Sequence, residues 1–405
     1  MASSGSAGSP APSAPKILLA KPGLVSGASV APKFGRGAPS DDDAASLRPR
    51  LPPIGSLNLL SDSWDFHFDR FLPFLTENTD FTVIGVIGPP GVGKSTILNQ
   101  LYGFDPTSPG MLPPFATQSE DTRAMAKHCS NGIEPRVSAD RLILLDTQPV
   151  FSPSVLAEMI RPDGSSTIPV LGNESLSAEL AHEIMSIQLG VLLSSICHIL
   201  LIVSEGVHDN SMWRLMLTVD LLKHGIPDPS SLIPAHSQTT NMGLEKEYKD
   251  KLLGREEYMA APVFVHTKLH DQEMNPHSVV YLRKAFAQCF RSSSFMREKQ
   301  DKEAKLIDYV SACTESNVQG SKSPNLFLIP SKNIDDSSEP LYESYNSALW
   351  KLRDEVLSMS GPSFTRTVSE RDWLRNSAKI WELVKNSSII TEYAKTLQNS
   401  GTFRR

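Results

Sequence analysis

The chain of 405 residues has few cysteines and no long apolar run. Its four cysteines are scattered, with no metal-ligand spacing, at Cys129, Cys197, Cys289 and Cys313. This usage is typical of a reducing, intracellular setting, and we expect a cytoplasmic protein. The most apolar stretch, Leu189 to Val203, is interrupted by serines and a histidine and is too short to span a membrane. We therefore expect no membrane partner.

The sequence also lacks an excess of positive charge. The net charge is −6, so no global basic field favours nucleic-acid binding by charge alone, and we expect no direct sequence-specific contact with nucleic acid. The hydrophobic fraction of 40% is sufficient for a proper core. The length is enough for one large domain plus tails, or for two small domains.

The first 57 residues are rich in Ala, Ser, Pro and Gly and predict a disordered tail. The first 40 contain no acidic residue and four basic ones, as an organelle transit peptide would. We favour the disordered tail because prolines and glycines dominate and no amphipathic, arginine-rich helix is evident.

One motif stands out within the remaining chain. Residues Gly88 to Ser95 fit the phosphate-binding pattern G-x-x-x-x-G-K-[ST] without a mismatch, between an apolar run and a helical pattern. Backbone N–H groups of such a loop form an anion site, to which a lysine adds a point charge and a serine offers a hydroxyl for Mg²⁺. The predicted nucleotide-contacting residues are Gly88, Pro89, Pro90, Gly91, Val92, Gly93, Lys94, Ser95 and Thr96.

Apolar runs and helical patterns alternate along the chain, which indicates βαβ units in a mainly parallel sheet with helices on both faces. This predicts a P-loop NTPase of the G-domain type in the α/β class, over residues 58–360, and a helical extension over 361–405. The expected strands are Phe81–Ile87, Arg141–Leu145, His198–Val203, Pro262–His266 and Leu326–Ile329. The expected helices are Ser95–Tyr102, Ser177–Leu193, Asn210–His224, Ser278–Arg291, Leu341–Leu357 and a final stretch over Glu370–Gln398.

Two segments at the borders of this domain allow more than one interpretation. Six aromatic or apolar side chains crowd between Trp64 and Phe74, as in a clamp that packs on the domain or a segment that binds a partner. The apolar residues of Glu370–Gln398 are spaced as in a helix, which would pack on the core or form an arm for a partner.

A second nucleotide motif has an aspartate but lacks the usual switch residues. Asp146 follows four apolar residues, as in a Walker B strand, and would orient the bound water or Ser95 on Mg²⁺. G domains usually continue as D-x-x-G, whereas here Pro149 has no N–H to offer a γ-phosphate. Val150 follows it and cannot orient water. We expect slow or absent hydrolysis. Thr117 and Thr122 are candidates for the second Mg²⁺ hydroxyl, and we favour Thr122.

The base-recognition motif is also incomplete. Thr267 and Lys268 fit the pattern [NT]-K-x-D, but His270 stands where the aspartate would accept two hydrogen bonds from guanine. Ser331 and Lys332 echo the S-A-K loop at the end of the last strand. The predicted cofactors are Mg²⁺ and a purine nucleotide, GTP/GDP or ATP/ADP, with the base left open.

The residues of these motifs resemble those of the SMG-nine family of nonsense-mediated mRNA decay factors. The resemblance covers roughly Asn58 to Leu357 and is carried by Ile87–Thr96, Leu145-Asp-Thr-Gln-Pro149 and Leu201–Val207. It implies a G-like fold that pairs with a second G-domain-like protein, SMG-eight. It also implies binding to SMG-one, a large phosphatidylinositol-kinase-related protein kinase, whose phosphorylation of an RNA helicase is thereby restrained.

Two functions remain open. An intact phosphate loop beside Pro149 and Val150 favours a nucleotide-binding regulatory subunit that is not, or only weakly, an enzyme. The alternative is an active switch GTPase or ATPase that controls a protein partner, supported by the intact Lys94, Ser95 and Asp146. A small-molecule kinase would need a lid with arginines placed for phosphates, and only Arg123 and Arg136 lie near.

Overall fold

The computed structural model describes residues 57–61, 63–105, 112–172, 176–232, 258–296, 325–332 and 342–400. Every described residue lies within Ile54–Arg405, one of the two units into which the chain divides. The tail expected over residues 1–57 therefore lies outside the described residues, apart from its last residue. No helix in the described ranges is both long and apolar enough to cross a membrane.

The described part of the chain is built around a six-stranded sheet with the order β2-β3-β1-β4-β5-β6. All neighbouring pairs are parallel except β2 and β3, which are antiparallel. The strands are β1 (Thr82–Ile87), β2 (Ile133–Val137), β3 (Leu142–Thr147), β4 (Ile199–Glu205), β5 (Ala261–Leu269) and β6 (Leu326–Pro330). The mainly parallel G-domain-like sheet predicted from the sequence is confirmed, with strand ends shifted by at most three residues.

The edge strand β2 is the element that the sequence did not predict. Its residues Ile133-Glu-Pro-Arg-Val137 have no continuous apolar run, and Pro135 lies at the middle of the strand. Proline lacks an N–H and is tolerated in a sheet only where a hydrogen bond is not needed, as on an edge strand. The expected five strands were thus one too few, because β2 is stabilised by its pairing with β3 and has no strong local pattern of its own.

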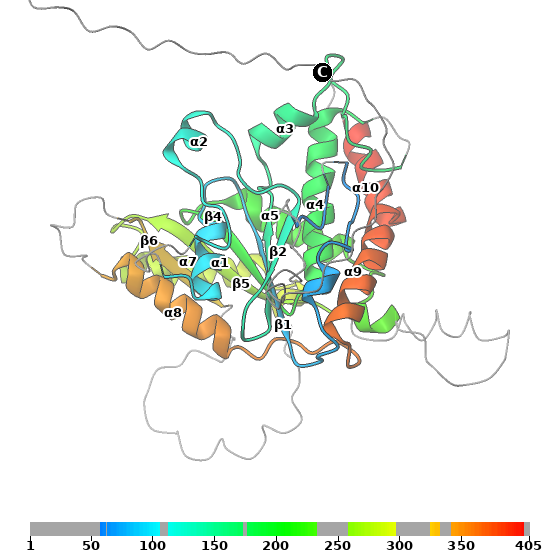
Figure 1. Cartoon of the computed structure of the whole chain (residues 1–405). Coiled ribbons are helices and arrows are strands. Elements are labelled where there is room, and N and C mark those ends of the chain that lie inside the picture. The colour runs from blue at the N-terminus through cyan, green and yellow to red at the C-terminus, as the bar shows by residue number, and fades with distance from the viewer. Residues whose placement is uncertain are drawn as a thin grey trace, which may run out of the picture. The chain divides into compact units, whose positions relative to one another are not determined.

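Helices cover both faces of the sheet (Figure 1). On one face, α1 (Lys94–Tyr102) and α8 (Tyr345–Ser358) pack over side chains such as Ile84 and Val86. On the other face, side chains such as Val83 and Ile87 pack against α4 (Ala178–Ile196), α5 (Asn210–Leu222), α7 (Pro276–Cys289) and α9 (Glu370–Lys385). The alternation along β1 is the usual two-residue period of a strand buried on both faces. Two short helices, α2 (Glu120–Ala124) and α3 (Pro153–Met159), lie in connections that the sequence left without structure.

The C-terminal stretch forms two helices that pack on the core. Helix α9 is followed by α10 (Ser388–Asn399), because the Ser387 side chain caps a new N-terminus by accepting from the Ile390 N–H. Trp373 and Trp381 of α9 are fully buried, and Trp381 Nε1 donates to the carbonyl oxygen of Trp64 at 3.2 Å. The indole rings of Trp64 and Trp381 meet edge to face, with centroids 5.4 Å apart. Both border segments thus form one packed layer over α4, as the clamp interpretation predicts.

A charged contact fixes this layer to the sheet. The fully buried carboxylate of Glu370, at the start of α9, pairs with the guanidinium of Arg141 in the turn before β3. It also accepts hydrogen bonds from the N–H and hydroxyl of Thr76, at 2.7 and 3.0 Å. Because the buried charge is paired and hydrogen-bonded, α9 has a single register against the sheet.

His198 makes the stability of the sheet depend on pH. Its Nδ1 accepts the Val83 N–H at 2.9 Å, and burial lowers its pKa to about 4. A histidine in the unfolded chain titrates near 6.5, so the unfolded state takes up the proton first as pH falls. We expect this histidine to contribute stability above pH 6.5 that is lost between pH 6.5 and 4, up to about 3 kcal/mol. Chemical denaturation of the wild type and His198→Asn at pH 7 and 5 measures it, and equal pH slopes would contradict the expectation.

Candidate functional site: a phosphate loop and its carboxylate

The phosphate loop lies at the carboxyl edge of the sheet, between β1 and α1. Strand β1 lies between β3 and β4, and the chain passes to one side of it and then to the other. In parallel α/β sheets, such a change of direction leaves a crevice at the strand ends where ligands bind. Gly91 and Gly93 have φ values of +73° and +95°, which other residues rarely adopt. A Cβ on Gly88 would lie 2.2 Å from the Val203 carbonyl oxygen, so only glycine permits this close approach to β4.

Lys94 lies folded back along the loop. Its ammonium group donates to the carbonyl oxygens of Gly88 and Pro89 at 3.0 and 2.9 Å, and the side chain is buried. Burial lowers the pKa of Lys94 to about 8, against the opposing effect of the Asp146 carboxylate. Most of the ammonium groups are therefore charged at neutral pH. The loop holds a positive charge without a full anionic partner, which suits the binding of a phosphate.

Asp146 lies at the end of β3 and is fully buried. Its Oδ2 accepts a hydrogen bond from Ser95 Oγ at 2.7 Å and another from Ser130 Oγ at 2.7 Å. Its Oδ1 accepts the Thr147 N–H at 3.0 Å. Burial raises the pKa of Asp146, while Lys94 and the hydroxyl donors oppose that rise. The carboxylate and the serine hydroxyl are hard oxygen donors and fit Mg²⁺.

The oxygen set alone would not enclose a metal ion. Among the described residues, no group of three or more His, Cys, Asp or Glu side chains could hold one. Mg²⁺ commonly keeps few protein ligands and takes the rest from phosphate oxygens and water. The pair Ser95 and Asp146 therefore fits a metal that arrives with a nucleotide, and does not fit a dedicated protein cage.

A cavity of about 130 Å³ opens over the phosphate loop. It is lined by Pro90, Gly91 and Gly93–Thr96 of the loop, by Pro149, and by both ends of the connection from Ala116 to Ser130. Thr117 belongs to this lining and Thr122 does not. Thr122 lies in α2, where its hydroxyl is 2.5 Å from that of Ser119. The structure therefore brings Thr117, and not the favoured Thr122, to the phosphate loop.

Residues after Asp146 are held by the protein itself. The Val150 N–H donates to the Gly88 carbonyl oxygen at 3.1 Å, and its side chain is buried. Gln148 pairs with Gly132 twice, by its backbone N–H at 2.8 Å and by its side-chain oxygen at 3.1 Å. The side-chain oxygen of Gln148 is thus tied to the edge of the sheet.

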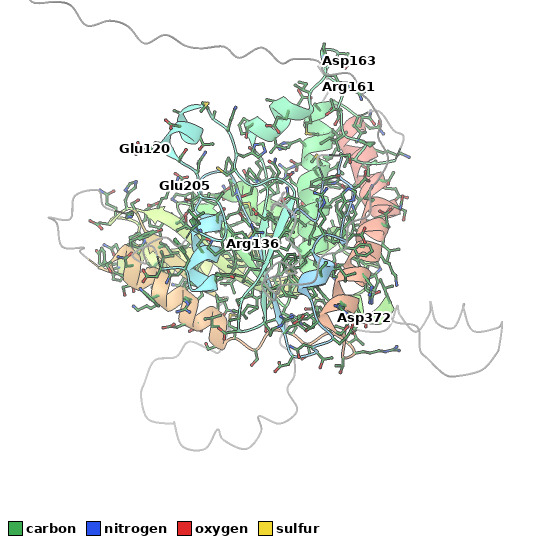
Figure 2. All side chains as sticks on the ribbon, in the orientation of Figure 1. Glu120, Arg136, Arg161, Asp163, Glu205 and Asp372 are labelled. Atoms are coloured by element: carbon green, nitrogen blue, oxygen red, sulfur yellow. The ribbon has the colours of Figure 1, made fainter. Side chains whose placement is uncertain are left out.

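The predicted base-recognition residues gather at the ends of β5 and β6. The buried Thr267 hydroxyl bridges the carbonyl oxygens of Val92 and Ser204, at 2.9 and 3.1 Å, and so supports the phosphate loop. Lys268 adopts a left-handed φ of 57°, and its ammonium pairs with Glu205, labelled in Figure 2, at 2.8 Å. The Ser331 N–H donates to the Leu269 carbonyl oxygen at 2.9 Å. Lys332 and His270 are exposed.

The sequence analysis did not assign two hydroxyl residues that the structure places at the site. Ser130 contacts Asp146 but lies three residues before β2, and no motif covers it. Thr117 is a candidate for the second Mg²⁺ hydroxyl in the sequence, but Thr122 is favoured there. The sequence signal for such a residue is a serine or threonine shortly before the edge strand that pairs with the strand of Asp146. This signal can be used only once β2 has been recognised as a strand.

The strand order, the phosphate loop and the Ser95–Asp146 contact define a G-domain-like α/β fold of the P-loop class. The chain is similar in sequence to the nonsense-mediated mRNA decay factors named SMG9. It is 27% identical over 379 residues to the one from Xenopus tropicalis, covering 87% of this chain and 69% of the relative. The factor from Salmo salar is 26% identical over 359 residues, with 84% and 67% covered. No family model matches the chain.

Solved structures with some similarity include two GTPase-type domains. One is the septin GTPase domain from Chlamydomonas reinhardtii, with 13% identity, a TM-score of 0.25, and 79% of this chain and 98% of that chain covered. The other is the Ski7 GTPase-like domain from S. cerevisiae, bound to GTP, with 10% identity, a TM-score of 0.28, and 69% and 50% covered.

Proposed function

We propose that the protein is a nucleotide-binding regulatory subunit of nonsense-mediated mRNA decay. The observation that carries nucleotide binding is a glycine-bearing loop in which the Lys94 ammonium lies against the Gly88 carbonyl oxygen and the Ser95 hydroxyl donates to Asp146. The printed name of the relatives supports the pathway. Bound nucleotide would stabilise the fold by mass action, since it binds the folded state alone.

The loop's own residues would divide the work of holding a nucleotide. The backbone N–H groups of the loop Gly88–Thr96, which Pro89 and Pro90 lack, would receive the phosphates, with Lys94 as the point charge. Ser95 and Asp146 would hold Mg²⁺, which neutralises phosphate charge when bound. We assign base contacts to Thr267 and Lys268, with Ser331 and Lys332 beside them. The identity of the base, guanine or adenine, is not assigned, because His270 cannot accept two hydrogen bonds as the usual aspartate does.

Hydrolysis is expected to be slow or absent. Pro149 has no N–H for a γ-phosphate, Val150 is buried and apolar, and the Gln148 amide is used by Gly132. We expect the purified wild type to carry a purine nucleotide, identified by mass spectrometry, and to melt at higher temperature when GTP or ATP with Mg²⁺ is added. Single-turnover hydrolysis at the rate of an activated GTPase would contradict the inactive-subunit part. An unmoved melting temperature together with no copurifying nucleotide would contradict nucleotide binding.

The proposed partners are a second G-domain-like subunit of the SMG-eight type and a protein kinase of the SMG-one type, in the cytoplasm. The support is the sequence homology to SMG9 factors over most of the chain. Co-expression of the three chains followed by size-exclusion chromatography tests this proposal, since this protein should elute together with the kinase.

The second candidate is a switch GTPase or ATPase. It is favoured by the intact contact of Ser95 with Asp146. A switch must bind its partner differently in the triphosphate and diphosphate forms. Partner affinity measured with non-hydrolysable triphosphate and with diphosphate separates the two functions, and equal affinities exclude the switch.

A further inference from the structure

We propose that Ser130 is a positioning residue for the metal: its hydroxyl fixes the Asp146 carboxylate in the orientation that Mg²⁺-nucleotide requires. This inference rests on the proposed nucleotide binding and assigns a role to a residue outside every nucleotide motif of the sequence. Ser130 lies three residues before the edge strand β2, and only 8% of its surface is exposed.

The hydrogen bonds of Asp146 leave it little freedom to rotate. A carboxylate has about four acceptor positions. Oδ2 accepts from Ser95 and Ser130, both at 2.7 Å, and Oδ1 accepts the Thr147 N–H at 3.0 Å. Three positions are thus filled by protein donors, and one remains for a metal-bound water or the ion. Rotation of the carboxylate would break at least one of the three bonds.

The backbone around Ser130 is itself held against the strand of Asp146. Glu134 of β2 pairs with Asp146 in the antiparallel register. Two residues after Ser130, Gly132 exchanges two hydrogen bonds with Gln148, at 2.8 and 3.1 Å. Ser130 and Asp146 therefore move as one unit, because sheet pairing joins the residues directly after Ser130 to the strand of Asp146.

The donors of Asp146 belong to different parts of the site. Ser95 belongs to the phosphate loop and must also turn a lone pair to Mg²⁺ when the metal binds. Ser130 does not belong to that loop and has no such second task. Ser130 also lies at the end of the connection that lines the cavity. The two ends of this connection are joined by a hydrogen bond from the Gln118 side chain to the Lys127 carbonyl oxygen at 3.0 Å. The Ser130 hydroxyl can thus keep the carboxylate aligned whether or not the loop holds a ligand.

The test compares the Mg²⁺ dependence of nucleotide binding in matched variants of the full chain. Fluorescent mant-GDP and mant-ADP are titrated against the wild type, Ser130→Ala, Ser130→Thr and Ser138→Ala, with Mg²⁺ varied and with EDTA. Outer-shell partners of a metal site typically contribute 10- to 100-fold in metal affinity. We expect Ser130→Ala to need about 10- to 100-fold more Mg²⁺ for half-maximal tightening, with its affinity in EDTA unchanged.

The control variants separate positioning from structure. Ser138 lies at the other end of β2, is as buried as Ser130, and accepts the Leu142 N–H at 3.2 Å without contacting Asp146. Ser138→Ala should leave the Mg²⁺ midpoint unchanged, and Ser130→Thr, which keeps the hydroxyl, should restore it. A wild-type midpoint in Ser130→Ala, or an equal loss of affinity in EDTA, overturns the proposal. If the wild type binds neither nucleotide, the proposed function fails, and the positioning role fails with it.

Discussion

Replacing Lys94 and Ser95 together with alanine is expected to abolish nucleotide retention. The change removes the buried ammonium at the loop and the hydroxyl that joins the loop to Asp146. A hydrogen bond to a charged group contributes about 1.5–3 kcal/mol, so the pair should account for about 3–6 kcal/mol. That corresponds to a loss of affinity of at least about 100-fold. Isothermal titration with GDP and ADP, and mass spectrometry of the purified variant, measure the loss.

A matched pair on α8 controls for the loss of one lysine and one serine. Lys351 is largely exposed, and the Ser358 hydroxyl donates only to the carbonyl oxygen of Glu355 in its own helix. The variant Lys351→Ala with Ser358→Ala should keep wild-type nucleotide affinity. Circular dichroism must show that both double variants are folded. A folded Lys94/Ser95 variant that still copurifies with nucleotide would contradict the assignment of the loop.

Trp373→Ala is expected to destabilise the whole described domain by about 3–5 kcal/mol. The indole is fully buried, its ring centroid lies 6.3 Å from that of Phe81, and its Nε1 donates to the Ile196 carbonyl oxygen at 2.8 Å. Truncation leaves a cavity and an unpaired carbonyl at the last residue of α4. The free energy of unfolding from urea titration measures the effect. This result would make α9 part of the fold, and no separate arm for a partner.

An exposed tryptophan provides the control for this change. Trp350 on α8 is 53% exposed, and the Arg353 guanidinium lies over its ring, 5.5 Å from the centroid. Because exposed cation–π contacts contribute little, Trp350→Ala should cost no more than about 1 kcal/mol. Similar losses in the two variants would mean that α9 is not packed as described.

The fold was predictable wherever a local pattern was strong. The runs that form β1, β3 and β4 are apolar along nearly their whole length because they are buried on both faces of a parallel sheet. Strand β2 escaped because an edge strand has no need of such a run, and Pro135 argues against a strand unless its position at the edge is known. The break between α9 and α10 depends on the Ser387 cap within one helical pattern, and was also missed.

The parts of the site that are contiguous in sequence could also be predicted from the sequence. Lys94 and Ser95 follow their glycines within one loop, so spacing alone identifies them. The second hydroxyl was not accessible, because Thr117, Thr122 and Ser130 differ only in where their connection folds. A threonine of the base motif, Thr267, also has a contact that spacing could not reveal, since its hydroxyl supports the phosphate loop through Val92.

The sequence by itself determined the phosphate loop, the buried strand before it and the aspartate that faces it, because each depends on residues close together in the chain. Only the tertiary structure decided which hydroxyls reach Asp146 and whether the aromatic borders belong to the core. Ser130 reaches the carboxylate through the pairing of β2 with β3. Trp64 meets Trp381 across 317 residues of sequence. Such contacts arise when separate elements bury shared surface, and no local pattern of residues records which elements will meet.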